Sequence, residues 1–379
     1  MGWRGSSGSM SPVSAHDIDD FNARARAFLQ VHAQAAAQDL VSNLRTRVDR
    51  IGSGEALFPV TINDDEPDNA WVCSPRTTYG RYAIEEAERY APKIAAPLLS
   101  VVGRGVDAGL RAARIDHAVA INNWCLSTNL YPSHSQVSVP QLLDEALQRW
   151  PSHAIWLRSL NDVDHCDWLA ECERLGFVLI PSRQVYLFRD VAALARQRHN
   201  LKVDLKLAAK QARRAGDDDI GEDDYARIAG LYGQLYISKY SRCNPHYTAE
   251  FMRRWHCAGL LQFDGFRGEE GQLICIAGQF RQGRTLTTPI VGYDTALPQR
   301  LGLYRLSTAM TFEHAIRDGC DINFSAGAAG FKRLRGGRPS IEYSAVYARH
   351  LPARTRETLA WLSALTRRLG VPLMRRFEL

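Results

Sequence analysis

Hydrophobic and polar positions predict alternating helices and strands along the first half of the chain. From His16 to Arg50 the apolar residues recur at roughly helical spacing. The predicted strands are short apolar runs at 56–62, 70–73, 118–122, 154–159 and 177–188. The predicted helices lie near 80–92, 94–114, 138–150 and 164–175. This alternation favours an α/β layer structure through residue 190.

The order of elements changes after residue 190, where helices come first and strands follow. Helices are expected at 192–215, 222–240, 298–317 and 352–368, and strands at 259–266, 272–281, 284–293, 321–325 and 341–349. We therefore expect two α/β halves of similar size. The predicted division is a disordered leader at 1–14, an N-terminal lobe at 15–190, a C-terminal lobe at 191–350 and a final helix at 351–379.

The composition, with 45% hydrophobic and 23% charged residues among 379, is typical of a globular protein of two domains. No run reaches the ~18 to 20 apolar residues of a membrane-spanning helix, and the first ten residues lack the apolar segment of a secretory signal. We therefore expect a cytoplasmic protein without a membrane span. Its preference for arginine over lysine fits a bacterial, GC-rich genome.

The eight cysteines form no C-x-x-C pair and predict small buried thiols in a reducing compartment. The tightest Cys/His cluster consists of Cys243, His246, His256 and Cys257, and it matches no known zinc-finger spacing. The sequence therefore predicts no metal site.

Positive charge is concentrated between Arg196 and Arg214, where seven basic residues stand against the single acid Asp204. Lys202, Lys206 and Lys210 are four residues apart and form one cationic stripe on a helix. Such a stripe attracts a phosphate-bearing partner over a long range. The alternative is a solvated helix face with no ligand.

Two segments carry a resemblance to a known family. CERLGFVLIPSRQVYLF (172–188) resembles the helix-to-strand corner of GNAT acyltransferases. The segment 297–337 resembles the second lobe of Fem/CelD-like GNAT proteins, with a Pro-led helix, Gly319, Asp321, a small-residue loop and the pair Phe331-Lys332. The resemblance implies two GNAT-like lobes in tandem, each a mixed, mostly antiparallel sheet flanked by helices. The long coiled-coil arm of the peptidoglycan-bridge enzymes has no counterpart here, which weakens that particular role.

The start of the helix near residue 299 is the first candidate for binding a co-substrate. GNAT enzymes carry Q/R-x-x-G-x-G/A at this point, and the exposed amides of the helix hold a pyrophosphate. Gln299 and Gly302 match that pattern, whereas Tyr304 replaces the last small residue and would crowd coenzyme A. Arg300 and Arg305 could instead meet the phosphates of a tRNA end. An ordinary helix start is the alternative.

The small-residue loop that begins at Ser325 and leads to Phe331-Lys332 is the second candidate, because its backbone can run close to a ligand. The resemblance implies that Lys332 lies beside the transferred aminoacyl group. An ammonium near a tetrahedral oxyanion is worth roughly 3 kcal/mol. A flexible basic turn is the alternative. Tyr293 and Asp294, at the end of a strand, could help remove a proton from the attacking amine, although Asp is common in turns.

Three further residues are candidates for binding the substrate. Tyr240 lies on a helix face rich in tyrosine, an arrangement that is also typical of an ordinary amphipathic face. Arg158 and Arg183 lie at predicted strand ends of the first lobe, which the resemblance implies helps to bind the acceptor.

The leading hypothesis is an N-acyltransferase that moves an aminoacyl or acyl group onto an amine by positioning the reactants. Aminoacyl-tRNA is favoured as the carrier, acyl-CoA is the alternative, and no cofactor is expected to be tightly bound. A non-catalytic protein that binds a phosphate-rich ligand is the rival. Hydrolase, NTPase and metalloprotease motifs are absent from the sequence. The acceptor and the oligomeric state stay open.

Overall fold

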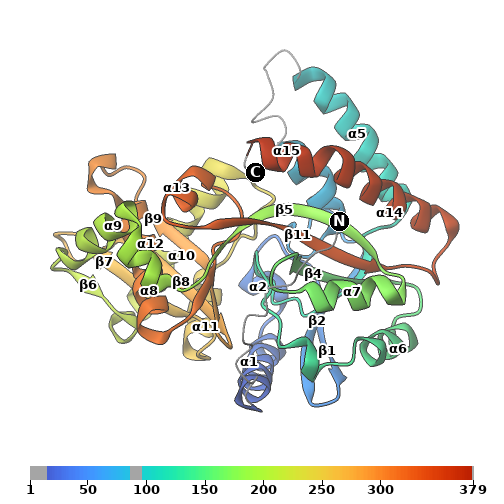
Figure 1. Cartoon of the computed structure of the whole chain (residues 1–379), viewed down its shortest axis with the longest axis horizontal. Coiled ribbons are helices and arrows are strands. Elements are labelled where there is room, and N and C mark those ends of the chain that lie inside the picture. Colours follow the sequence, from blue (N-terminus) through green and yellow to red (C-terminus); the bar gives the residue numbers. More distant parts are fainter. Residues whose placement is uncertain (1–14, 86–95, 378–379) are drawn as a thin grey trace, which may run out of the picture.

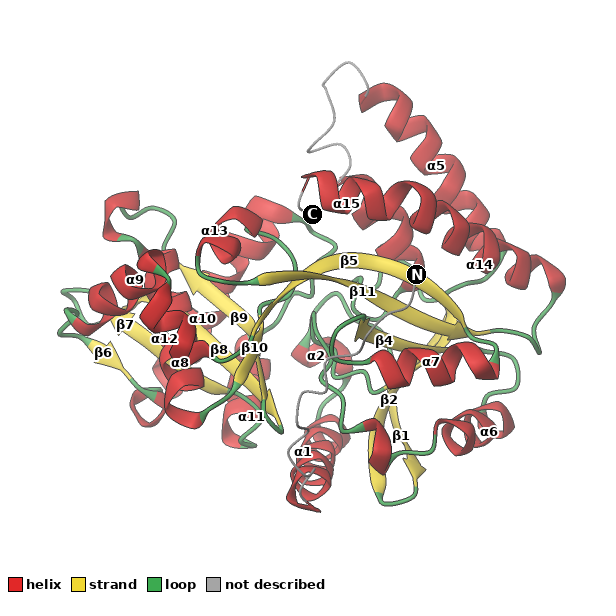
Figure 2. Cartoon of the chain, in the orientation of Figure 1, coloured by secondary structure: helices red, strands yellow, loops and turns green. Residues whose placement is uncertain are grey.

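The computed structural model describes residues 15–85 and 96–377. The predicted leader at 1–14 and part of the predicted helix near 80–92 lie outside these residues. The described chain forms one sheet of eleven strands in the order β1-β2-β3-β4-β11-β5-β10-β9-β8-β7-β6, with helices on its faces (Figures 1 and 2). Most neighbouring strands are antiparallel, and β3–β4 and β9–β10 are parallel. The predicted fold class, a mixed and mostly antiparallel α/β arrangement, is confirmed.

The N-terminal lobe contains the strands β1 to β4 and is covered on both faces. Phe21 and Phe58 pack with ring centroids 5.1 Å apart on the face that carries α1, α6 and α7. Trp156 and Leu359 belong to a second buried cluster on the opposite face, beneath α5 and α14. The strands are β1 (Arg47–Ser53), β2 (Ala56–Asp64), β3 (His117–Ile121) and β4 (Ala154–Asn161).

The C-terminal lobe contains the strands β6 to β10 and is likewise covered on both faces. On the face covered by α10 and α11, Trp255 of α11 and Phe263 of β7 are buried in the same cluster. Met310 and Cys275 are buried on the other face, where α12 lies against α9. The strands are β6 (Arg214–Ala215), β7 (Gln262–Arg267), β8 (Leu273–Gln282), β9 (Thr285–Tyr293) and β10 (Asp321–Asn323).

Two long strands, β5 (Val178–Phe188) and β11 (Arg338–Tyr347), join the lobes. β11 comes late in the chain but lies between β4 and β5, and the last residues of β5 pair with β10. Figure 2 shows both strands curving from one lobe to the other. Arg183 on β5 is opposite Glu342 on β11, and the two side chains form a buried bidentate ion pair of 2.8 and 3.1 Å. The lobes therefore share one sheet, and the predicted domain limits stay predictions.

The helices follow the predicted order with a few differences. The α-helices are α1 (Ala15–Gln34), α2 (Ala37–Leu40), α3 (Pro75–Thr77), α5 (Ala96–Ala112), α6 (Val139–Arg149), α7 (Cys166–Leu175), α8 (Val191–Gln197), α9 (His199–Ala209), α10 (Glu222–Tyr232), α11 (Ala249–Cys257), α12 (Leu303–Asp318), α13 (Ala329–Leu334), α14 (Ala353–Leu365) and α15 (Val371–Phe377). Short stretches of other helix types include η1 (Thr78–Tyr82), η5 (Gly233–Tyr240), η6 (Gln299–Leu301) and η7 (Thr366–Gly370).

Three predicted elements are wrong, each for a local reason. The helical pattern expected up to Arg50 stops earlier, because residues 47–53 pair with β2 in a hairpin. The apolar run 70–73 is a turn that buries Trp71, since a buried turn and a buried strand have similar composition. The helix expected at 192–215 breaks at Arg198, whose backbone is extended, and ends before β6. Within residues 15–85 and 96–377, none of the helices has the length and apolar character required to cross a bilayer.

Candidate active site

Two adjoining cavities lie where β9 and β10 separate. β10 pairs with β9 only at 285–287, and β9 then continues to Tyr293 without it. The inner cavity has a volume of about 240 Å³ and the outer one about 370 Å³. Five residues line both cavities, namely Leu235, Tyr240, Tyr304, Ala328 and Phe331. The sequence-predicted Tyr240, Tyr304 and Phe331 are therefore brought together at the junction.

The inner cavity lies between the lobes, because both contribute to its wall. Trp71 and Arg183 come from the N-terminal side, and Tyr236 and Thr288 come from the C-terminal lobe. The Trp71 indole donates a hydrogen bond of 2.9 Å to Asn244, whose amide donates one of 2.9 Å to the carbonyl oxygen of Tyr236. These contacts hold the aromatic wall in a fixed arrangement.

Arg183 and Arg158 lie close to this wall in different roles. Arg183 lines the inner cavity, but its guanidinium is also bound to Glu342 and lies 5.0 Å from the Trp71 ring centroid. Arg158 is buried, donates to the carbonyl oxygen of Val72 and to Asn123, and does not line either cavity. Burial lowers the pKa of Arg158. The structure thus brings Arg183 to the site, and it places Arg158 behind Trp71.

Lys332 holds the small-residue loop in place. Its ammonium donates to the carbonyl oxygens of Phe324, Ser325 and Ala326, at 2.7, 3.1 and 2.8 Å. Since an ammonium has three donors, all of them are engaged. Burial first, and then the charge of Arg183, lowers the pKa of Lys332 well below its ordinary value.

These contacts explain an unusual loop backbone. Ser325 and Ala328 adopt left-handed conformations with φ of 56° and 50°, which cost roughly 1–3 kcal/mol each in non-glycine residues. The Lys332 ammonium compensates by bonding three successive carbonyls of the loop. In this arrangement Lys332 positions the loop, and its engaged donors do not favour the oxyanion contact expected from the sequence.

The outer cavity lies at the start of α12. Gly302 is the N-cap, with a left-handed φ of 65°, and a Cβ there would meet the Leu207 side chain at 3.2 Å. Because Gly302 has no side chain to cap the helix, the amides of the first turn are left for solvent or a ligand. Gln299, Gly302, Tyr304 and Arg305 all line this cavity, and the co-substrate role expected for them from the sequence stays a prediction.

Two arginines that line the outer cavity share one aspartate. Arg305 bonds Asp204 at 2.6 Å, and the guanidinium of Arg335 bonds the other oxygen of the same carboxylate. The Arg335 guanidinium also lies over the Phe331 ring, 3.3 Å from its centroid. Two cations against one carboxylate leave a net positive charge next to the amides of α12.

Tyr293 and Asp294 line the outer cavity, but the contacts of Asp294 are those of a turn residue. Its carboxylate accepts from Arg227 at 2.7 Å and from the backbone of Ala296 at 3.0 Å. The hydrogen bond from Arg227 lowers the pKa of Asp294. A carboxylate held in an ion pair with a low pKa is a weak proton acceptor at neutral pH.

The remaining predicted residues lie away from the cavities. Lys202, Lys206 and Lys210 are exposed on the outer face of α9, and Arg300 is exposed on η6. The stripe is present as predicted but does not line either cavity. The Cys/His cluster does not converge either, since Cys243 contacts Glu85 whereas His256 contacts Asp217.

Sequence reasoning missed Asp204, Arg335 and the wall formed by Trp71 and Tyr236. Asp204 stood out only as the one acid in the basic segment, but it also occupies a helical position between the buried residues Leu201 and Ala208. An acidic residue on the apolar face of a cationic helix was the sequence signal that could have indicated a buried ion pair. The contribution of Trp71 depends on tertiary contacts that no local pattern encodes.

The separating strands β9 and β10 and the start of α12 lie within one segment that can be compared with known families. Residues 188–333 match the family model described as acetyltransferase (GNAT) domain. The match confirms the GNAT resemblance that the sequence predicted. No curated protein sequence matches the chain.

Three solved structures illustrate the similarity in fold. FemX is 9% identical, with 86% of this chain and 95% of that chain covered and a TM-score of 0.49. The C-terminal domain of a putative lysylphosphatidylglycerol synthetase from Agrobacterium fabrum is 13% identical, with 62% and 79% covered and a TM-score of 0.46. A tandem GNAT protein from the clavulanic acid biosynthesis pathway is 12% identical, with 60% and 75% covered and a TM-score of 0.37.

Proposed function

We propose that this protein is an N-acyltransferase that moves an aminoacyl or acyl group from a phosphate-bearing carrier onto an amine. The observation that carries the proposal is the pair of adjoining cavities at the β9–β10 split, one lined by aromatic side chains and the other cationic. The outer cavity offers the phosphate of the carrier the first-turn amides of α12 and the guanidinium of Arg305. The inner cavity has room for a small acyl or aminoacyl group.

The reaction needs no covalent enzyme intermediate. The amine attacks the carbonyl carbon, a C–N bond forms, and the C–O or C–S bond to the carrier breaks. The amine loses a proton to solvent, and the leaving oxygen or sulfur gains one. Orientation of the two reactants in the adjoining cavities supplies much of the rate. The role of Lys332 is to fix the loop from Phe324 to Ala328 that forms part of the inner wall.

Aminoacyl-tRNA is the favoured carrier. Tyr304 fills the position where a small residue would leave room for a CoA pyrophosphate, and its ring packs 4.8 Å from that of Phe331. The exposed Lys202, Lys206 and Lys210 on α9 also suit a long polyanion that extends beyond the cavity. Acyl-CoA is the second candidate, because Gln299 and Gly302 keep part of the GNAT phosphate-binding pattern.

One set of variants separates the two carriers. Filter binding of aminoacyl-tRNA and calorimetry with acyl-CoA are compared for Arg305→Gln and for the triple variant Lys202→Gln/Lys206→Gln/Lys210→Gln. With tRNA, the triple variant weakens binding and reduces the salt slope by about 2–3, because three phosphate contacts are lost. With acyl-CoA, only Arg305→Gln weakens binding.

The matched control replaces three exposed arginines of the N-terminal lobe, Arg26, Arg45 and Arg50, by glutamine. This control removes the same charge and should leave tRNA binding within a factor of two. An equal loss in the control would mean that only net charge matters. Failure of the wild-type protein to form an amide from either carrier would refute the proposed function.

A further inference from the structure

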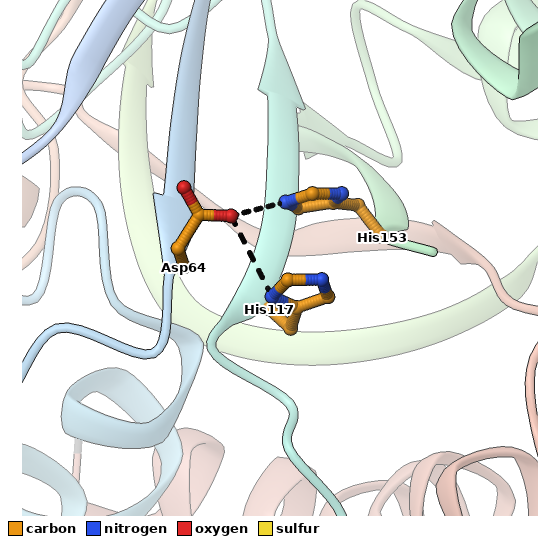
Figure 3. Close-up of side chains that lie close together, drawn as sticks. All are labelled: Asp64, His117 and His153. Carbon is orange, nitrogen blue, oxygen red and sulfur yellow. Dashed lines mark hydrogen bonds and ion pairs between the residues drawn. The ribbon is translucent and has the colours of Figure 1, made fainter. Parts of the chain in front are cut away.

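Three side chains from three adjacent strands converge at one edge of the N-terminal lobe. Asp64 ends β2, His117 begins β3, and His153 immediately precedes β4. Asp64 and His117 are register partners in the antiparallel β2–β3 pair, and the residues after the two histidines are partners in the parallel β3–β4 pair. The sheet itself thus places the three residues in one row (Figure 3).

The geometry points to a binding site for one divalent zinc-type metal ion, held by Asp64 Oδ1, His117 Nδ1 and His153 Nε2. All three atoms lie within 4.8 Å of one another. The Asp64 oxygen is 2.8 Å from His153 Nε2 and 3.7 Å from His117 Nδ1, as the dashed lines in Figure 3 indicate. Ligands bound tetrahedrally at zinc distances are about 3.3 Å apart. The two imidazole rings are stacked with centroids 3.7 Å apart, so the rings would rotate to point both nitrogens at one ion.

The remaining ring nitrogens are already held in the way that metal-bound imidazoles require. The Ser152 hydroxyl oxygen lies 3.2 Å from His117 Nε2 and 3.4 Å from His153 Nδ1. A hydroxyl oxygen has two lone pairs and can accept from both rings at once. With these two nitrogens protonated, the other nitrogen of each ring is free to bind a metal, which is the usual outer support of a histidine ligand.

The donor set determines the class of metal. Two imidazoles and one carboxylate suit zinc and similar divalent transition metals, whereas magnesium and calcium prefer oxygen ligands. The Asp64 side chain is 42% exposed, so solvent can reach the site and supply a fourth ligand. Asp65 is another source of a fourth ligand, because its carboxylate lies 3.9 Å from His117 Nδ1.

Two arginines face this cluster and compete with a cation. Arg47 bonds the outer oxygen of Asp64 at 3.0 Å, which leaves Oδ1 to the histidines. Arg114 bonds Asp65 at 2.7 Å and lies 3.4 Å from His117 Nδ1. The Arg114 side chain is 64% exposed and can turn into solvent when a metal binds. A bound metal would tie together the ends of β2, β3 and β4.

The sequence offered no sign of this site, because the three residues are 53 and 36 positions apart and follow no known spacing. The proposal is independent of the acyl-transfer reaction, since none of the three residues lines the two cavities of the candidate active site.

The test is metal titration of the chelator-treated full chain. Calorimetry with Zn²⁺ should give one site, and the Tm should rise by a few degrees with excess metal. His117→Gln and His153→Gln should each weaken binding at least 100-fold. The matched control is His134→Gln, which breaks the pair between His134 and Glu171. This pair is not part of the three-residue cluster, so metal affinity should not change. Arg114→Asn, which suits the left-handed backbone there, should tighten binding severalfold.

Co²⁺ provides a second readout that does not depend on variants. The wild-type protein should give visible bands of a nitrogen- and oxygen-bound Co²⁺ without the near-ultraviolet charge-transfer band of a thiolate ligand. Absence of binding, a thiolate band, or an affinity that His153→Gln leaves unchanged would each overturn the proposal.

Discussion

The ion-pair cluster around Asp204 allows a worked prediction. The side chains of Asp204 and Arg335 are only 1% and 7% exposed, and a second arginine, Arg305, bonds the other carboxylate oxygen with a 38% exposed side chain. Asp204→Asn keeps the shape of the side chain but removes its charge. Two guanidinium groups then share a site with no counterion.

The magnitude follows from the burial of each pair. Removing one partner of a buried ion pair costs about 3–5 kcal/mol, because the other charge is left without compensation. Losing the partly exposed pair with Arg305 adds only about 0–1 kcal/mol to this cost. The asparagine oxygen still accepts one hydrogen bond, so we expect a loss near the lower limit, about 3 kcal/mol.

Urea unfolding at pH 7 measures this loss as a change in the free energy of unfolding. The matched control is Asp68→Asn, which removes an exposed pair with Arg81 where the Asp68 side chain is 81% exposed. Asparagine also tolerates the left-handed backbone of residue 68, so the control should cost less than about 1 kcal/mol. Equal losses in the two variants, or a loss below 1 kcal/mol in Asp204→Asn, would refute the reasoning.

Two further variants test the loop and the pH dependence. Lys332→Met should reduce the rate of transfer at least 100-fold, because the loop carbonyls lose their hydrogen-bond donor. The free energy of unfolding should change by only about 1–2 kcal/mol, because methionine loses the hydrogen bonds but also avoids the cost of burying a charge. Full turnover by the variant in steady-state kinetics would contradict this role. Burial lowers the pKa of His32 to about 4, so the folded state disfavours protonation and stability falls as the pH drops below about 6.5. Between pH 7 and pH 5 this histidine should lower the free energy of unfolding by about 2 kcal/mol, and the variant His32→Leu should lack this loss. Identical pH profiles of urea unfolding in the wild-type protein and in His32→Leu would count against this prediction.

Much of the fold could be predicted from the sequence, because hydrophobic periodicity reports local structure directly. The hairpins of β7, β8 and β9 and the helix that ends at Gly319 follow from turn residues and capping. The position of β11 between β4 and β5 could not be predicted, since strand order depends on long-range pairing. The apolar run around Trp71 predicts a strand although it is a turn, because a buried turn and a buried strand have the same apolar composition.

In the candidate site, too, local features could be predicted from the sequence and long-range contacts could not. Phe331, Tyr304 and Gly302 were found because they lie within one contiguous motif, which the structure folds around the cavities. The engaged donors of Lys332 could not be read from the sequence, because they depend on the direction of three loop carbonyls. Asp204 was hidden among lysines that point the other way.

Transfer of a radiolabelled acyl group to amine acceptors tests the central claim most directly. The wild-type protein is incubated with labelled aminoacyl-tRNA or acyl-CoA and a panel of amines, beside Phe331→Ala and the control Trp361→Ala, whose tryptophan is 48% exposed on α14. We predict a labelled amide from one carrier class, lost at least 100-fold in Phe331→Ala and retained in Trp361→Ala. Absence of label transfer from both carriers, or full transfer by Phe331→Ala, would contradict the account.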